Sequence, residues 1–131
     1  MLAVDTNVVV RFLVCDDARQ TQRASALFRS EDIWLPKTVL LETEWVLRRL
    51  YRLNGDRVLA ALRALIGLPN VQVEDAAAVG RALEWTTLGL DFADALHWAS
   101  RGESRQFVSF DENLVKRSAR AGLTGVTLLG V

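Results

Sequence analysis

Short apolar runs alternate with longer segments of helical periodicity, and this alternation constrains the fold more than any other feature. The short runs are bounded by acids, Gly or Pro, as buried strands are. They cover residues 2–4, 33–35, 71–74, 106–110 and 126–129. Buried strands connected by helices are typical of a parallel sheet. The sequence therefore predicts an α/β fold with a central, mostly parallel sheet.

Helices are expected between these strands, because apolar residues recur there at helical spacing and capping residues precede them. The expected helices cover residues 18–30, 37–53, 57–68, 75–89, 92–102 and 112–122. Between the second and third of these helices, Asn54-Gly55-Asp56 ends one helix and caps the next. Residues 8–14 fit either a strand or a helix, and periodicity does not decide between them. Trp34, Trp45 and Trp98 stand in apolar contexts that favour packing in the core or at a dimer interface over stacking on RNA bases.

The composition limits both the size of the protein and its possible chemistry. A chain of 131 residues fits one domain, residues 1–131. Sixteen basic and sixteen acidic residues give a net charge near zero, so nucleic acid must be bound by a local patch or through a metal. With Cys15 and His97 as the single residues of their types, a metal site must use oxygen ligands. No signal peptide or membrane-spanning run is recognised, so we expect a cytoplasmic protein.

Four acids interrupt apolar segments and are the main candidates for chemistry. Asp5 and Asp111 each follow a predicted strand, whereas Glu42 and Asp94 lie within predicted helices. Because ligands of open α/β sheets bind beyond the carboxyl ends of the strands, one shared site is plausible. Carboxylates gathered without basic partners favour a hard divalent cation such as Mg²⁺ or Mn²⁺. Asp91 lies one helical turn before Asp94 and is a weaker candidate ligand.

Each acid also has a simpler structural explanation. Asp5, Asp91 and Asp111 precede helical or possibly helical segments and are good N-caps. Asp94 suits the first turn of its helix, where the helix dipole favours an acid. Glu42, in mid-helix, is hardest to explain in this way. Taken singly, none of these positions is specific for a metal site.

The order of four motifs resembles the PIN-domain ribonucleases and, within them, the VapC toxins of prokaryotic toxin–antitoxin pairs. The motifs that carry the resemblance are AVDTNVVVRFL with Asp5, LPKTVLLETEWVLRRLY with Glu42, LDFADALHWA with Asp94 and FVSFDENLVKRSARAG with Asp111. Each motif is short, but together they span nearly the whole chain. The family more often has Thr than Ser near its last acid, and Ser109 retains the hydroxyl.

The resemblance implies a three-layer PIN-like domain, with a mostly parallel five-stranded sheet and helices on both faces. It implies that the four acids bind Mg²⁺ or Mn²⁺ and that the protein cleaves RNA endonucleolytically. It also implies inhibition by a small VapB-like antitoxin and assembly into a homodimer. Each of these properties is an expectation drawn from the family.

Other polar residues are candidates for supporting roles. Thr6, Asn7 and Ser109 stand beside the proposed ligands and could orient them. The alternatives are a turn residue at Asn7 and a satisfied strand hydroxyl at Ser109. Arg11 and Arg49 are candidates for contacts with RNA phosphates.

Three other readings are weighed against this one. His97 could act as a general acid or base, although a partly buried structural histidine is the more frequent case. A phosphotransferase of the haloacid-dehalogenase type would need a second Asp two positions after Asp5, where this chain has Asn7. A degenerate PIN module acting mainly in protein binding is the remaining alternative.

Overall fold

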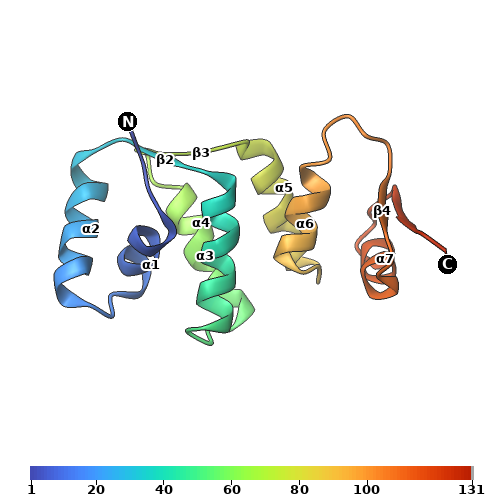
Figure 1. Ribbon diagram of the computed structural model, residues 1–131, viewed down its shortest axis with the longest axis horizontal. Helices are drawn as coiled ribbons and strands as arrows, with labels where there is room; N and C mark the ends of the chain where they lie inside the picture. Colours follow the sequence, from blue (N-terminus) through green and yellow to red (C-terminus); the bar gives the residue numbers. More distant parts are fainter. Residues whose placement is uncertain (131) are drawn as a thin grey trace. The chain divides into compact units, whose positions relative to one another are not determined.

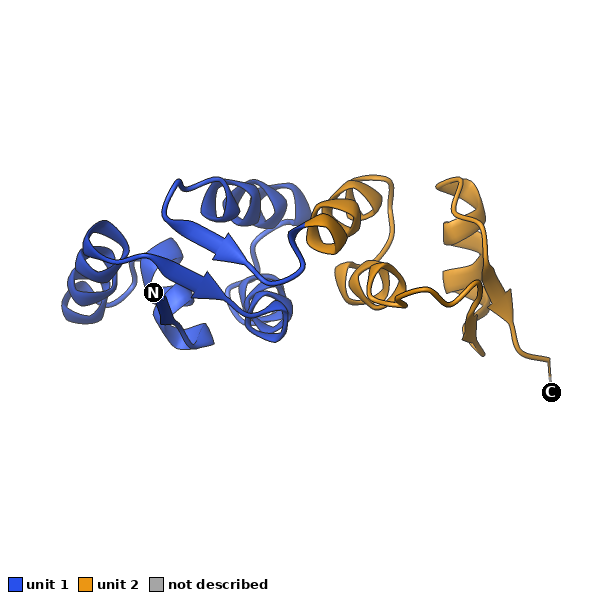
Figure 2. Cartoon of the chain, turned by 90° about the horizontal axis from the view of Figure 1, so that it is seen from above, with its two compact units in different colours: residues 1–76 blue, residues 77–131 orange. Residues whose placement is uncertain are grey.

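The computed structural model describes residues 1–130, which form two compact units. Unit 1 comprises Met1–Ala76 and unit 2 comprises Ala77–Val131, shown in blue and orange in Figure 2. The fold of each unit is given separately below.

Unit 1 alternates strands with pairs of helices, as the sequence predicts (Figure 1). Its elements are β1 (Leu2–Ala3), α1 (Thr6–Val14), α2 (Ala18–Ser30), β2 (Ile33–Leu35), α3 (Lys37–Arg49), α4 (Gly55–Ile66) and β3 (Val71–Val73). The strands pair in parallel in the order β1-β2-β3. β2 is the central strand, and its Ile33 aligns with Leu2 on one side and Val71 on the other. Figure 2 shows helices of this unit on both sides of its strands.

Unit 2 contains the remaining elements, apart from the first residue of α5. They are α5 (Ala76–Thr87), α6 (Phe92–Ala99), β4 (Phe107–Ser109), α7 (Glu112–Arg120) and β5 (Val126–Leu128). β4 and β5 pair in parallel, with Phe107 aligned with Val126. All five strands of the described residues are therefore parallel, three paired in unit 1 and two in unit 2. The expectation of an α/β fold is confirmed.

The undecided segment 8–14 is helical and belongs to α1. Asp5 caps this helix, and Val9 and Val10 are buried. The helix ends at Cys15, which adopts a left-handed conformation with φ of 61° and donates its N–H to the carbonyl of Arg11. Val4 is buried, but Leu2 and Ala3 of β1 are exposed, so the prediction of a buried strand at residues 2–4 was wrong. Asp5 lies between β1 and α1, at a strand end and a helix start together.

The buried face of α3 differs from the one predicted. The expected stripe comprised Val39, Thr43, Val46, Leu47, Leu50 and Leu53. Of these the structure buries Thr43 and Leu47, and it also buries Leu40 and Glu44. Trp45 is 49% exposed and does not pack in the core of unit 1, so only packing at a dimer interface remains as a prediction for it. A buried glutamate is tolerated because Arg48, one turn later, pairs with it.

Aliphatic side chains from strands and helices form the interior of unit 1. Its fully buried members include Ile33, Leu35, Leu40, Leu47, Leu62 and Leu65. In unit 2, Val79, Leu83 and Phe92 are almost completely buried. In the part of the chain that the structure describes, no helix combines the length and apolar character needed to cross a membrane.

Candidate metal-binding site

Asp5 and Glu42 line one cavity of unit 1, with a volume of about 360 Å³. Asp5 comes from the turn between β1 and α1, and Glu42 from the middle of α3. The complete lining is Asp5, Thr6, Asn7, Val10, Arg11, Glu42, Val46, Leu50 and Tyr51. Two of the four predicted ligands are thus brought to one cavity by elements far apart in the sequence.

Asp5 both caps a helix and faces this cavity. Its Oδ1 accepts a hydrogen bond of 2.8 Å from the backbone N–H of Thr6, which fixes the carboxylate at the start of α1. Its Oδ2 has no hydrogen-bond donor among residues 1–130. The capping explanation is therefore correct and leaves one oxygen for another partner.

Glu42 differs sharply from its neighbour Glu44. Glu42 is exposed and forms neither a hydrogen bond nor an ion pair with the described residues. The side chain of Glu44 is 6% exposed and accepts hydrogen bonds from Arg48 at 2.8 and 3.3 Å. Glu42 is thus the acid of α3 that remains available to a cation. The Glu44–Arg48 pair was not predicted, although its i,i+4 spacing is a recognisable signal.

Thr6 and Asn7, the expected supports of Asp5, differ in environment. Thr6 is buried, and its Oγ1 has no hydrogen-bond partner within residues 1–130. Asn7 is exposed and lines the cavity beside Asp5. Thr6 supports Asp5 through its backbone N–H. A supporting role for the two side chains stays a prediction.

Three more acids influence one another in unit 2. Asp91 caps α6, and its Oδ2 accepts a hydrogen bond of 3.3 Å from the N–H of Asp94. Burial raises the pKa of Asp94, and the neighbouring charges of Asp91 and Asp111 raise it further. His97 and Arg117 act in the opposite direction and lower that pKa. Asp94 is therefore a carboxylate whose negative charge is disfavoured where it stands.

Asp111 is the N-cap of α7, and it accepts hydrogen bonds from residues farther along its helix than Asp5 does. Its Oδ1 accepts hydrogen bonds from the backbone N–H groups of Asn113 and Leu114 at 2.9 and 3.2 Å. The hydroxyl of Ser109 accepts a 3.0 Å hydrogen bond from the N–H of Asp111. Ser109 thus fixes the backbone at this acid.

The chemistry of these donors suits a hard divalent cation. Asp5 and Glu42 offer carboxylate oxygens without a basic partner among the described residues, and Asp94 carries a disfavoured charge. Neither unit, over residues 1–130, gathers three or more Asp, Glu, His or Cys side chains into a group that could hold a metal ion. The four predicted ligands divide equally, with Asp5 and Glu42 in unit 1 and Asp94 and Asp111 in unit 2.

Arg11 borders the cavity and is held by several partners. Its Nη1 donates to the hydroxyl of Tyr51 at 2.8 Å and to Asp16 at 3.2 Å, and its Nε donates to Gln20 at 2.7 Å. The hydrogen bond with Tyr51 is the largest cause of a raised Arg11 pKa. Tyr51 in turn donates a 2.6 Å hydrogen bond to Asp16, whose pKa is lowered. Arg49, the other predicted RNA contact, is exposed on α3.

The PIN domain family model matches residues 2–120. The chain belongs to the PIN domain family. The matched segment includes residues of both units and contains Asp5, Glu42, Asp94 and Asp111. This PIN domain has no match among the curated proteins.

A similar solved structure is the Mycobacterium tuberculosis toxin VapC20, described as cleaving the sarcin-ricin loop. The two chains are 24% identical and superpose with a TM-score of 0.45. The aligned region covers 88% of this PIN domain and 94% of VapC20.

Proposed function

We propose that this PIN domain is an endoribonuclease that depends on Mg²⁺ or Mn²⁺ and acts as the toxin of a type II toxin–antitoxin system. The observation that carries the proposal is the shared cavity of Asp5 and Glu42, two carboxylates without a basic partner within the described residues. Membership of the PIN family supports it.

The proposed ligands are Asp5, Glu42, Asp94 and Asp111, with Asp91 as a possible fifth. A divalent cation bound by these carboxylates would lower the pKa of water and stabilise negative charge on a phosphate. The chain's own residues prepare the ligands for this work. The N–H of Thr6 holds Asp5, and the hydroxyl of Ser109 holds the backbone of Asp111. Asp94 would gain the most, since a cation would offset the charges that raise its pKa.

The remaining parts of the proposal follow the family resemblance. Thr6, Asn7 and Ser109 would orient the ligands, and Arg11 and Arg49 would contact RNA phosphates. Arg11 is suited to this because three partners already fix its orientation. The partners would be RNA, a VapB-like antitoxin and a second copy of the chain in the cytoplasm.

Metal binding can be tested without relying on activity. We expect Mn²⁺ to raise the melting temperature of the parent, by the equivalent of about 2.7 kcal/mol at one hundred times its dissociation constant. Asp5→Asn and Asp94→Asn should each lose most of this stabilisation. Glu84→Gln, at an exposed acid of α5, is the matched control and should keep it.

The same variants test the reaction. The parent should cleave structured RNA with Mg²⁺ and stop when a chelator is added, whereas Asp5→Asn and Asp94→Asn should be at least about a hundredfold slower. Cleavage that persists in the variants or with chelator would contradict the metal-dependent mechanism. A parent that shows no stabilisation by Mn²⁺ and no cleavage would favour the alternative of a degenerate, protein-binding PIN module.

A further inference from the structure

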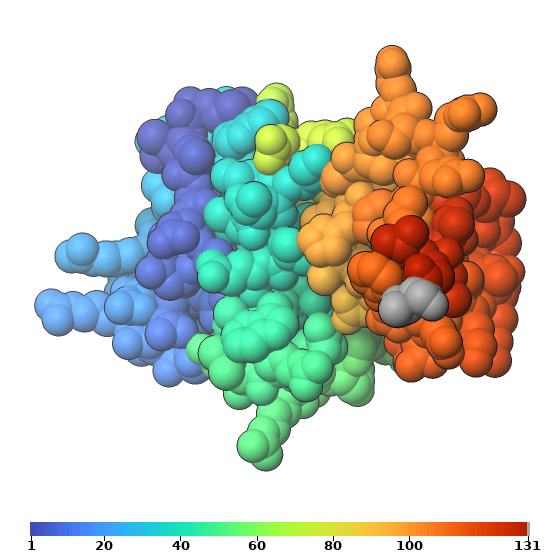
Figure 3. Space-filling model, turned by 45° about the vertical axis from the view of Figure 1, so that its right-hand side comes forward, coloured from blue at the N-terminus to red at the C-terminus, as the bar shows by residue number. Residues whose placement is uncertain are grey.

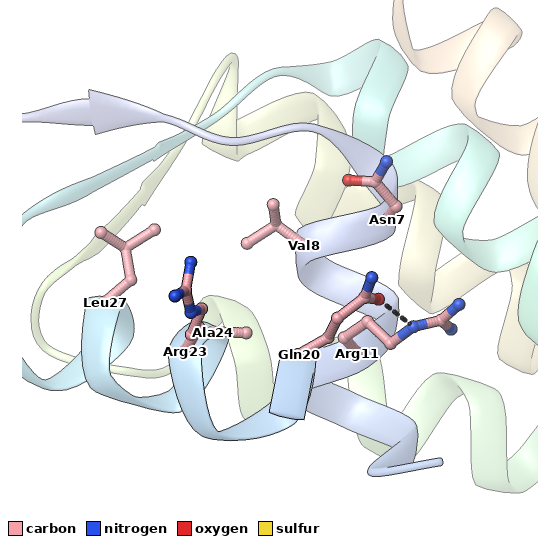
Figure 4. A pocket seen from close by; sticks show the side chains of 7 residues that line it. All are labelled: Asn7, Val8, Arg11, Gln20, Arg23, Ala24 and Leu27. Atoms are coloured by element: carbon pink, nitrogen blue, oxygen red, sulfur yellow. Dashed lines mark hydrogen bonds between the residues drawn. The ribbon is translucent and has the colours of Figure 1, made fainter. Parts of the chain in front are cut away.

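A second and larger cavity lies between α1 and α2 of unit 1 (Figure 4). Its volume is about 470 Å³. The residues that line it are Asn7, Val8, Arg11, Gln20, Arg23, Ala24 and Leu27. None of the proposed metal ligands lines this cavity, and only Asn7, Val8 and Arg11 of its lining belong to a sequence motif described above.

One part of the lining of this cavity is basic and polar, and the other part is apolar. Arg11 and Arg23 supply positive charge, and Gln20 supplies an amide group that accepts the hydrogen bond from Arg11 drawn in Figure 4. The apolar part consists of Val8, Ala24 and Leu27. No acidic side chain belongs to the lining. Such a surface suits a ligand that combines an anionic group with a flat apolar one.

Arg11 and Arg23 differ in whether hydrogen bonds hold their side chains in place. Arg11 is fixed by its hydrogen bonds to Asp16, Gln20 and Tyr51. Arg23 is exposed and has no hydrogen bond or ion pair with the residues that the structure describes. Side chains of the α2 segment, light blue in Figure 3, stand out from the surface. Arg23 is thus a cation without a carboxylate partner in unit 1.

The two cavities are adjacent, because Asn7 and Arg11 line both of them. A chain-like ligand with one phosphate beside Asp5 and Glu42 would extend past Arg11 into the cavity of Arg23. RNA fits this description better than a peptide does. Its phosphates match the guanidinium groups, and its unstacked bases pack on apolar or planar side chains.

We propose that the cavity between α1 and α2 binds a nucleotide of the RNA substrate adjacent to the cleaved phosphodiester. Arg23 contacts a phosphate of this nucleotide, and Val8 and Leu27 contact its base. The inference rests on the proposed ribonuclease function and adds a binding site that lies outside the metal ligands.

The test measures binding of a fluorescein-labelled single-stranded RNA by fluorescence anisotropy, with chelator present to prevent cleavage. Arg23→Ala should weaken binding about fivefold to tenfold. It should also reduce the slope of log K against log salt concentration by about 0.7, the value for one lost phosphate contact on a single strand. Arg29→Ala is the matched control, because Arg29 is an exposed arginine of the same helix outside the lining. It should change neither quantity appreciably.

The outcomes separate this inference from the proposed function. A parent that cleaves RNA, with Arg23→Ala binding and cleaving equally well, would contradict the inference alone and leave the cavity for a protein partner. A parent that does not cleave RNA, while Arg23→Ala still loses affinity and salt dependence, would contradict the ribonuclease proposal alone. Equal losses in Arg23→Ala and Arg29→Ala would also overturn the inference, because they would indicate a diffuse charge effect.

Discussion

Among the acidic side chains, the presence or absence of a basic partner distinguishes structural from functional candidates. Glu44 is buried and paired with Arg48, whereas Glu42, two positions earlier, is exposed and has no such partner within the described residues. A buried carboxylate without a cation would be costly, so Arg48 makes the position of Glu44 possible. Glu42 lacks this compensation and is therefore the better candidate for an external cation.

Asp94 provides a prediction about pH. Its pKa is raised from the ordinary value of 3.8, so the folded protein binds this proton more tightly than the unfolded chain does. The charged carboxylate therefore destabilises the folded state, and the effect grows as pH rises from 3.8 through the folded-state pKa. Asp94→Asn should raise the melting temperature at pH 7 by roughly 2 °C.

This difference in melting temperature should shrink as the pH is lowered toward 4, and thermal unfolding of parent and variant at several pH values would measure it. Glu84→Gln, at an exposed acid of α5, serves again as the control. An advantage for Asp94→Asn that grows with acidity would show that the Asp94 charge stabilises the fold. The expected result would mean that the fold is strained by an acid kept for function.

At the scale of elements, the locations of helices and strands were predictable because their signals are local. The helix at 18–30 has the predicted bounds, and Asp17 caps it. The nature of residues 8–14 was not predictable, since a short apolar run fits both structures until its neighbours in space are known. The same holds for α3, where the sequence does not tell which of Glu42 and Glu44 is buried; the structure buries Glu44 and pairs it with Arg48.

The candidate site was predictable only where its signals are local. Asp5, Asp91 and Asp111 are N-caps, as their sequence contexts indicated. The bonds of Arg11 to Tyr51 and Asp16 were beyond sequence reasoning, because they join side chains up to 40 positions apart. The cavity of Arg23 depends on how α1 and α2 pack, which periodicity does not reveal.

Replacing either of two glycines by alanine should change the stability of the protein, with opposite signs. Gly125, before β5, has φ of +87°, and an added Cβ would lie 2.6 Å from the carbonyl oxygen of Arg105. Gly125→Ala should destabilise the protein by at least about 2 kcal/mol through strain and this clash. Gly80, within α5, has nothing within 4 Å of an added Cβ. Gly80→Ala should stabilise by about 1 kcal/mol through helix propensity.

Chemical denaturation of both variants checks this pair. The opposite signs are the essential result, because both changes add the same methyl group. A Gly125→Ala variant as stable as the parent would show that the backbone near Arg105 adjusts freely.

At the scale of the whole molecule, the balance of charge limits how RNA can be recognised. Sixteen acidic and sixteen basic residues leave no net attraction for a polyanion. Under the proposed function, recognition of RNA would then come from local groups such as Arg11 and Arg23, and from a bound cation.

The balance of acidic and basic residues also predicts how the solubility of the protein depends on pH. With an isoelectric point near 6.6, we expect the lowest solubility near that pH and a several-fold increase by pH 8.5. Precipitation with polyethylene glycol at a series of pH values measures this. Arg29→Glu should move the minimum to lower pH, and an unchanged minimum would indicate that apolar surface, rather than charge, controls association.

The capping aspartates have a consequence for how such a protein can change over evolution. Asp5, Asp91 and Asp111 each hold the start of a helix, and asparagine caps a helix about as well as aspartate does. A change from Asp to Asn at these positions would remove a negative charge and leave the helix start intact. Under the proposed function, catalysis and folding would therefore be separable by single substitutions. A lineage could then lose the proposed nuclease activity and retain a sound scaffold for binding other proteins.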